Sequence, residues 1–113
     1  MLRGDVYQAS LGPVQGSEQA GLRPVVVVSR DAINRASPVA IVVPLTGLGN
    51  CPRVYPSQVV IGSGTGGLSM DSVALGEQVR AIAQKRLCSY LGHLPPEIMT
   101  KISVALKIAM DLP

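Results

Sequence analysis

A run of four valines between Pro24 and Ser29 limits the possible folds of this chain more than any other feature. Valine is stiff at χ1 and favours extended backbone, and a run without polar alternation is typical of a strand that is covered on both faces. The segment from Val39 to Leu45 predicts a second strand of the same kind. Two such strands predict a sheet that carries structure on both of its faces.

Short β-rich segments, separated by glycine and proline, fill most of the remaining chain before residue 95. Residues 31–35 predict a short helical turn, and residues 11–22 a long loop. We expect further strands over residues 5–11, 54–61, 72–75, 81–83 and 87–91, the second of them bent or at an edge because it contains Pro56. Many short strands at regular spacing are typical of a small barrel.

The last part of the chain predicts one amphipathic helix, which begins near Pro95 or Pro96 and ends near Asp111. Val104 and Ile108 lie away from its main apolar face, beyond a narrow polar stripe. We therefore expect a second buried contact, most simply a homodimer interface, unless these are ordinary scattered exposed residues. The main apolar face consists of Ile98, Ile102, Ala105, Leu106, Ala109 and Leu112, and the polar stripe of Ser103, Lys107 and Asp111.

Length and composition place the chain among small globular proteins. Its 113 residues predict a single domain over residues 1–113, and a 47% hydrophobic content excludes disorder. No apolar run approaches the roughly 20 residues that span a bilayer, and the first residues do not resemble a secretory signal, so we expect a cytoplasmic protein. Cys51 and Cys88 should stay reduced, and without a Cys/His cluster we expect neither a metal nor a cofactor.

Arginine dominates the positive charge of the chain. Seven of the ten basic residues are arginine, and all seven precede the expected helix. The planar fork of a guanidinium fits phosphate, whereas lysine is a point charge. This balance favours a polyanionic partner, although solvated arginines occur on any protein surface.

The most informative stretch is GSEQAGLRPVVVVS, in which a polar loop leads to Arg23 and then to a buried strand. Pro24 restricts Arg23 to extended backbone. A rigid strand would then anchor the base of the side chain, and its guanidinium can face a groove. The alternative is a simple ion pair between Arg23 and Glu18. Thr46 ends the second buried strand and would lie beside Arg23 if the two strands are neighbours; otherwise it is an ordinary turn residue.

A third segment, DSVALGEQVRAI, holds Glu77, Gln78 and Arg80 close together. The Gln78 amide both donates and accepts hydrogen bonds, which suits the reading of base edges. The alternative is a polar hairpin that faces water.

These motifs, with GDVY near the start, VPLT, LGHL and the apolar C-terminal helix, resemble the MazF/PemK toxins in order and spacing, from about Arg3 to Leu112. The resemblance implies a mainly β fold with a C-terminal α-helix, a small SH3-like, CcdB-like antiparallel barrel that forms a homodimer. It also implies that single-stranded RNA lies in a groove at the dimer interface. A cognate antitoxin would cover this region with an acidic, disordered tail.

Site residues follow from the resemblance position by position. The essential arginine and threonine of the family match Arg23 and Thr46, and its loop glutamate matches Glu18. Some members carry histidine at Ser17, and arginine and aspartate at Leu75 and Glu77, so their acid–base assignment does not transfer. The residues expected to bind RNA are Ser17, Gln19, Asn34, Arg35, Arg53, Gln78 and Arg80.

The implied activity is sequence-specific, metal-independent cleavage of single-stranded RNA. The 2′-hydroxyl attacks the adjacent phosphorus and leaves a 2′,3′-cyclic phosphate and a 5′-hydroxyl. Arg23 would stabilise charge on the phosphoryl oxygens and Thr46 would donate a hydrogen bond to one of them. The base stays open among Glu18, water and the substrate, because arginine keeps its proton. His93 is expected to be structural or exposed.

Two other functions compete with this hypothesis. The first is a CcdB-like gyrase poison on the same barrel, a class that uses a C-terminal tryptophan absent from this chain. The second is a non-catalytic single-strand or peptide binder, which would rely on aromatic surfaces. Only Tyr7, Tyr55 and Tyr90 are available for that role. A catalytically degenerate relative of the toxins also remains open.

Overall fold

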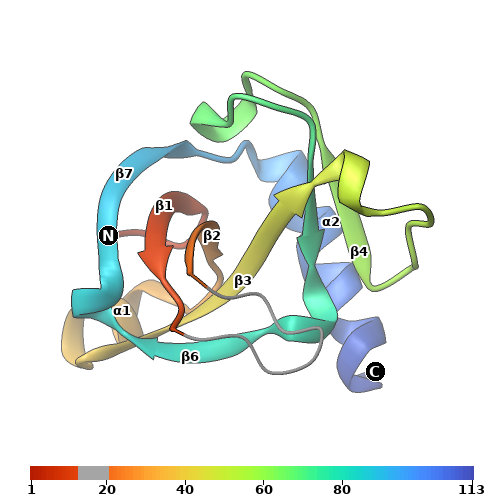
Figure 1. The fold of residues 1–113 in the computed structure, drawn as a ribbon. Helices are drawn as coiled ribbons and strands as arrows, with labels where there is room; N and C mark the ends of the chain where they lie inside the picture. Colours follow the sequence, from red (N-terminus) through yellow and green to blue (C-terminus); the bar gives the residue numbers. More distant parts are fainter. Residues whose placement is uncertain (13–20) are drawn as a thin grey trace.

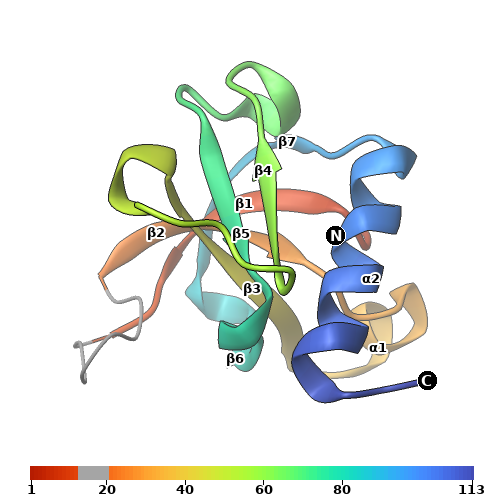
Figure 2. The same ribbon diagram turned by 90° about the vertical axis from the view of Figure 1, so that its right-hand side faces the viewer.

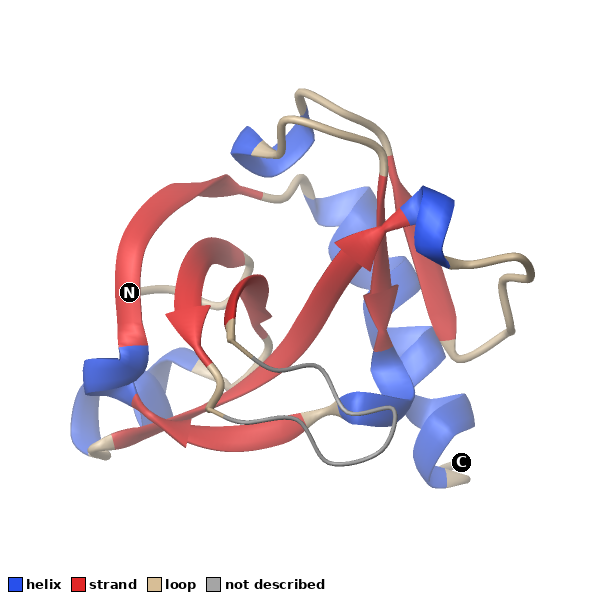
Figure 3. Cartoon of the chain, in the orientation of Figure 1, coloured by secondary structure: helices blue, strands red, loops and turns tan. Residues whose placement is uncertain are grey.

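The computed structural model describes residues 1–12 and 21–113, which form a curled antiparallel β-sheet with a C-terminal helix (Figures 1 and 3). The strands are β1 (Asp5–Ser10), β2 (Leu22–Val27), β3 (Val39–Gly47), β4 (Gln58–Ile61), β5 (Ser72–Leu75), β6 (Arg80–Ala83) and β7 (Leu87–His93), and the helices are α1 (Asp31–Ala36) and α2 (Pro96–Met110). The predicted mainly β fold with one long C-terminal helix is confirmed.

The long strand β3 organises the sheet, whose order is β4-β5-β3-β2-β1-β7. One edge of β3 pairs with β2. The other edge is divided, because its first half pairs with β6 and its last residues pair with β5. The sheet therefore curls around β3, and α2 packs beside β4 (Figure 2).

The valine-rich strands are buried on both faces, as their sequence predicts. Val26 and Val43 lie in one apolar core together with Ile102 of α2. Val25 and Val42, one residue away on the same strands, lie in a second core on the opposite face. Because successive side chains of a strand point to opposite faces, β2 and β3 serve both cores at once.

The strand predicted over residues 54–61 is shorter than expected, since β4 begins only at Gln58. The preceding residues form a turn in which the Gln58 N–H donates to the Tyr55 carbonyl at 2.9 Å. The Gln58 side chain closes the same turn by accepting a hydrogen bond from the Tyr55 N–H at 3.1 Å. Pro56 lies inside this turn, where its missing N–H costs no ladder hydrogen bond.

Helix α2 covers the sheet only with its first part. Ile102 and Ala105 are buried, whereas Leu112, which the sequence places on the same face, is 53% exposed. The expected apolar face is therefore covered in the single chain to about Leu106 and no further. Val104 and Ile108 are also half exposed, at 51% and 50%. No helix among the described residues is long and apolar enough to cross a membrane.

Candidate active site

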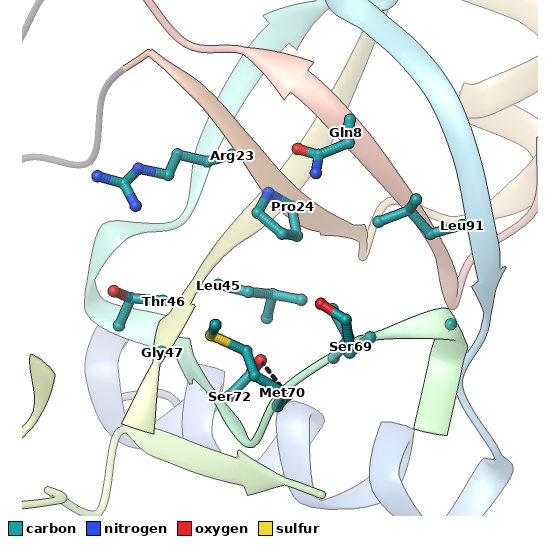
Figure 4. Close-up of a pocket in the computed structure, with 12 residues that line it drawn as sticks. Gln8, Arg23, Pro24, Leu45, Thr46, Gly47, Ser69, Met70, Ser72 and Leu91 are labelled. Atoms are coloured by element: carbon teal, nitrogen blue, oxygen red, sulfur yellow. Dashed lines mark hydrogen bonds between the residues drawn. The ribbon is translucent and has the colours of Figure 1, made fainter. Parts of the chain in front are cut away.

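The sheet brings Arg23 and Thr46 together at neighbouring strand ends. Val25 pairs with Pro44 and Val26 with Val43 in the antiparallel ladder of β2 and β3. Continuing this register by two residues sets Arg23 opposite Thr46. Both residues line one pocket, and Figure 4 shows the guanidinium extending beside the threonine hydroxyl.

This pocket is a cavity of about 390 Å³ with apolar walls and polar groups at its ends. Arg23 and Thr46 lie at one end, and Gln8 of β1 lies at another part of the wall (Figure 4). A mostly apolar cavity with a few convergent polar groups is the usual form of a ligand site. Its walls include Pro24, Leu45, Leu68, Met70 and Leu91.

A neighbouring amide orients the Thr46 hydroxyl. Thr46 is only 8% exposed, and its Oγ1 accepts a hydrogen bond from Asn50 Nδ2 at 3.1 Å. A hydroxyl that accepts in this way keeps its own proton for donation. Thr46 can therefore donate to an oxygen of a ligand at the pocket mouth. Sequence reasoning missed Asn50; its signal was an amide in the tight turn that follows the strand.

The backbone of Arg23 is fixed while its side chain reaches the surface. Arg23 pairs with Ala9 in the ladder of β1 and β2, and Pro24 follows it. The residue is exposed, and its guanidinium lies at the rim of the pocket. A forked donor on a rigid strand, beside an oriented hydroxyl, can bind two oxygens of one phosphate.

Three predicted residues, Ser17, Glu18 and Gln19, lie outside the described residues. The segment that holds them joins Gly12 to Gly21. The Gly21 N–H donates to the Gly12 carbonyl at 2.8 Å, which closes the base of this segment close to Arg23.

Asn34 does not form part of an RNA surface, which corrects the prediction made from the sequence. Its side chain is buried, and its Nδ2 donates to the Ser29 carbonyl at 3.0 Å. Its Oδ1 accepts a hydrogen bond from the Ser29 hydroxyl. The amide therefore holds α1 against the sheet. Arg35, its neighbour, is exposed on α1, beside the start of β3 and away from the pocket at its end.

The other predicted RNA contacts lie outside the pocket lining. The Arg53 guanidinium stacks over the Tyr55 ring at 5.2 Å in an exposed loop. Arg80 pairs with Val42, so by strand alternation it lies on the same face of β3 as Thr46. Gln78 is half-buried in the turn before β6.

The side chains of Glu77 and His93 are held away from the pocket. The Glu77 carboxylate accepts hydrogen bonds from the Ser57 hydroxyl at 3.1 Å and from Gln58 Nε2 at 2.8 Å. His93 Nδ1 lies 2.7 Å from an Asp5 carboxylate oxygen, where the start of β1 pairs with the end of β7. Neither residue lines the pocket. The described residues include no cluster of three or more His, Cys, Asp or Glu side chains that could hold a metal ion.

The fold and the pocket define a small antiparallel β-sheet protein in which an exposed arginine and an oriented threonine hydroxyl meet at one cavity. Residues 2–110 match the family model of the PemK-like, MazF-like toxins of type II toxin–antitoxin systems, and the chain belongs to this family.

Individual relatives agree with this assignment. The chain is 46% identical over 110 residues to a Bacillus subtilis (strain 168) protein named Endoribonuclease EndoA, covering 97% of this chain and 94% of that protein. A mycobacterial endoribonuclease solved in complex with its cognate antitoxin has a TM-score of 0.82 at 30% identity, covering 100% of this chain and 97% of that one. The crystal structure of MazF (Form-I) from Deinococcus radiodurans shares the fold, with a TM-score of 0.82 at 22% identity over 99% of this chain and 97% of that one.

Proposed function

We propose that this chain is an endoribonuclease, the toxin of a type II toxin–antitoxin pair, and that it cuts single-stranded RNA at the Arg23–Thr46 pair. The observation that carries this proposal is the placement of a forked cation beside an oriented hydroxyl at the mouth of one cavity. Family membership and the 46% identical relative named as an endoribonuclease support the same activity.

The proposed reaction needs no metal because the RNA supplies its own nucleophile. The 2′-hydroxyl attacks the adjacent phosphorus, its proton leaves, and the 5′-oxygen of the next nucleotide departs with a proton. The products are a 2′,3′-cyclic phosphate and a 5′-hydroxyl. Negative charge on the phosphoryl oxygens increases along this path, so catalysis depends on donors fixed in advance around them.

Arg23 and Thr46 divide that task. Arg23 offers two parallel N–H donors to the phosphoryl oxygens, and Thr46 offers the hydroxyl proton that Asn50 leaves available. Glu18 is the proposed base or the group that orients Arg23, and it lies outside the described residues. The proposed contacts to the rest of the strand and to its sequence are Ser17, Gln19, Arg53, Gln78 and Arg80.

We also propose a homodimer whose interface holds the RNA groove. Val104 and Ile108 support a second contact because they are apolar and half exposed on α2. A net charge of +3 suits a cognate antitoxin with an acidic, disordered tail that covers the groove. The proposed place of action is the cytoplasm, where the RNA substrate is.

The decisive experiment incubates the purified protein with a long mixed-sequence RNA in the presence of EDTA and maps the cut ends. We expect cuts at one short motif, each with a cyclic phosphate and a 5′-hydroxyl. An oligonucleotide with a 2′-deoxy nucleotide just 5′ of the cut should bind but stay intact. Cleavage of that oligonucleotide would contradict the 2′-hydroxyl route, and intact RNA throughout would contradict the endoribonuclease assignment.

A further inference from the structure

Gln8 is a polar residue in a row of apolar side chains. Residues on the same face of the sheet include Val6, two positions before it, and Val26 and Val43, all in one apolar core. Gln8 pairs with Pro24 in the ladder of β1 and β2, and the β2–β3 register continues this row to Leu45. Strand alternation would therefore favour an apolar residue at position 8.

The side-chain oxygen of Gln8 is buried without a partner, although the residue as a whole is only half-buried. Its Oε1 is inaccessible and accepts no hydrogen bond from any residue that the structure describes. Buried polar groups in folded proteins nearly always have partners, so an unpartnered one calls for an explanation.

Gln8 lines the cavity that opens at Arg23 and Thr46. Figure 4 shows Gln8 on the opposite side of Pro24 from the guanidinium, with Leu91 and Ser69 near it. The wall between the two polar ends is formed by Pro24 and Leu45. A ligand that reaches from the mouth to Gln8 would thus need an anionic group, a flat apolar body and a polar edge.

A nucleotide has these three parts in this order. We propose that the cavity receives one base of the RNA strand, next to the phosphate bound by Arg23 and Thr46, and that Gln8 selects this base by hydrogen bonding to its edge. The inference rests on the proposed function. An amide presents a donor and an acceptor side by side, which matches a base edge that carries an acceptor beside an N–H donor.

Gln8 acts here on specificity and not on the chemical step. Its amide does not titrate, and the phosphate contacts are supplied by residues at the other end of the cavity. Removing the amide should therefore change which base is accepted more than it changes how the phosphodiester is cut.

The test compares Gln8→Met with the unaltered protein on four sets of short RNA strands. Each set varies one of the two positions on either side of the cut and contains all four bases at that position. We expect Gln8→Met to lose about 5- to 150-fold of the base preference in kcat/KM at a single position, the range of one good bidentate base contact. Preferences at the other positions should stay unchanged. Binding of uncleavable 2′-deoxy strands should show the same single-position loss.

Gln58→Met is the matched control, because it removes an amide from the start of β4, outside the cavity lining. This variant should keep the full base preference. If Gln8→Met does not fold, Gln8→Asn withdraws the amide by one methylene and should show the same loss.

The outcomes separate this inference from the proposed function. Full base preference in folded Gln8→Met or Gln8→Asn, or an equal loss for all four bases, would overturn the role of Gln8 while the nuclease assignment stands. If the unaltered protein cuts no RNA, the proposed function itself fails.

Discussion

Polar side chains lie near both ends of β3, and they differ in how far their hydrogen bonds are satisfied within the chain. At its start, Ser29 and Asn34 bond to each other, the Ser29 hydroxyl accepts from the Ile41 N–H at 3.1 Å, and Gln84 Nε2 donates to the Asn34 carbonyl at 2.9 Å. At its other end, Thr46 keeps a proton to donate, and the side-chain oxygen of Gln8 is buried with no partner among the described residues. The first end uses its polar groups to hold the fold together, whereas the second carries the groups that we propose bind RNA.

The sharpest challenge to this contrast is Arg23→Ala. We expect cleavage to fall by about 100-fold or more, because a preorganised donor to the developing charge is lost. Arg23→Lys should also be impaired, since one ammonium does not replace a bidentate fork. Single-turnover cleavage of a motif-bearing RNA measures both variants. Near-normal cleavage by a folded Arg23→Ala variant would contradict the proposed role of Arg23 in the reaction.

Thr46→Val tests the hydroxyl with almost no change in side-chain shape. Loss of a hydrogen bond to a charged oxygen should lower the cleavage rate about 10- to 100-fold. Thr46→Ser, which keeps a hydroxyl, should retain most of the rate. Equal activity of the valine and serine variants would mean that the hydroxyl donates nothing to the phosphate.

Asn34→Ala tests the other end of β3. We expect the free energy of unfolding to fall by about 1–3 kcal/mol, because the partners of the buried amide lose their hydrogen bonds. Cleavage per folded molecule should stay unchanged. Urea denaturation measures the first quantity and cleavage at a temperature well below the transition measures the second. A stable variant with impaired cleavage would restore Asn34 as an RNA contact.

Gln8→Met should have the opposite effect on stability. Replacing an amide whose oxygen is buried without a partner by an apolar side chain of similar length should raise the free energy of unfolding by about 1 kcal/mol. Parallel urea titrations of Gln8→Met and the unaltered protein check this. A clear loss of stability would show that the amide serves the fold, as Asn34 does.

Arg35→Ala is the smallest change in the series and the matched control for Arg23→Ala. Arg35 is exposed on α1, at the end of β3 away from the pocket, so cleavage should stay within about 2-fold and stability within about 0.5 kcal/mol of the unaltered protein. RNA cleavage and urea denaturation measure the two. A large loss of cleavage would extend the functional surface to the α1 end.

That β2 and β3 are strands buried on both faces could be predicted, because uninterrupted β-branched runs have few alternatives. Their pairing, which sets Arg23 beside Thr46, does not follow from the runs and is given by the ladder of the folded chain. The length of β4 could not be predicted, because the Gln58 side chain and the Tyr55 backbone close a turn that only the folded chain reveals. The unpartnered state of Gln8 depends on what packs around it, which no local pattern encodes.

The hydrogen bond from Asn50 to Thr46 also bears on how the activity of such a site could be inhibited. A guanidinium keeps its proton and a threonine hydroxyl carries no charge over the pH range in which proteins stay folded. Both donors are therefore in place as soon as the chain folds. Under the proposed function, a protein that fills the mouth of the pocket would cover both donors at once, so its abundance would set how much of the toxin is active.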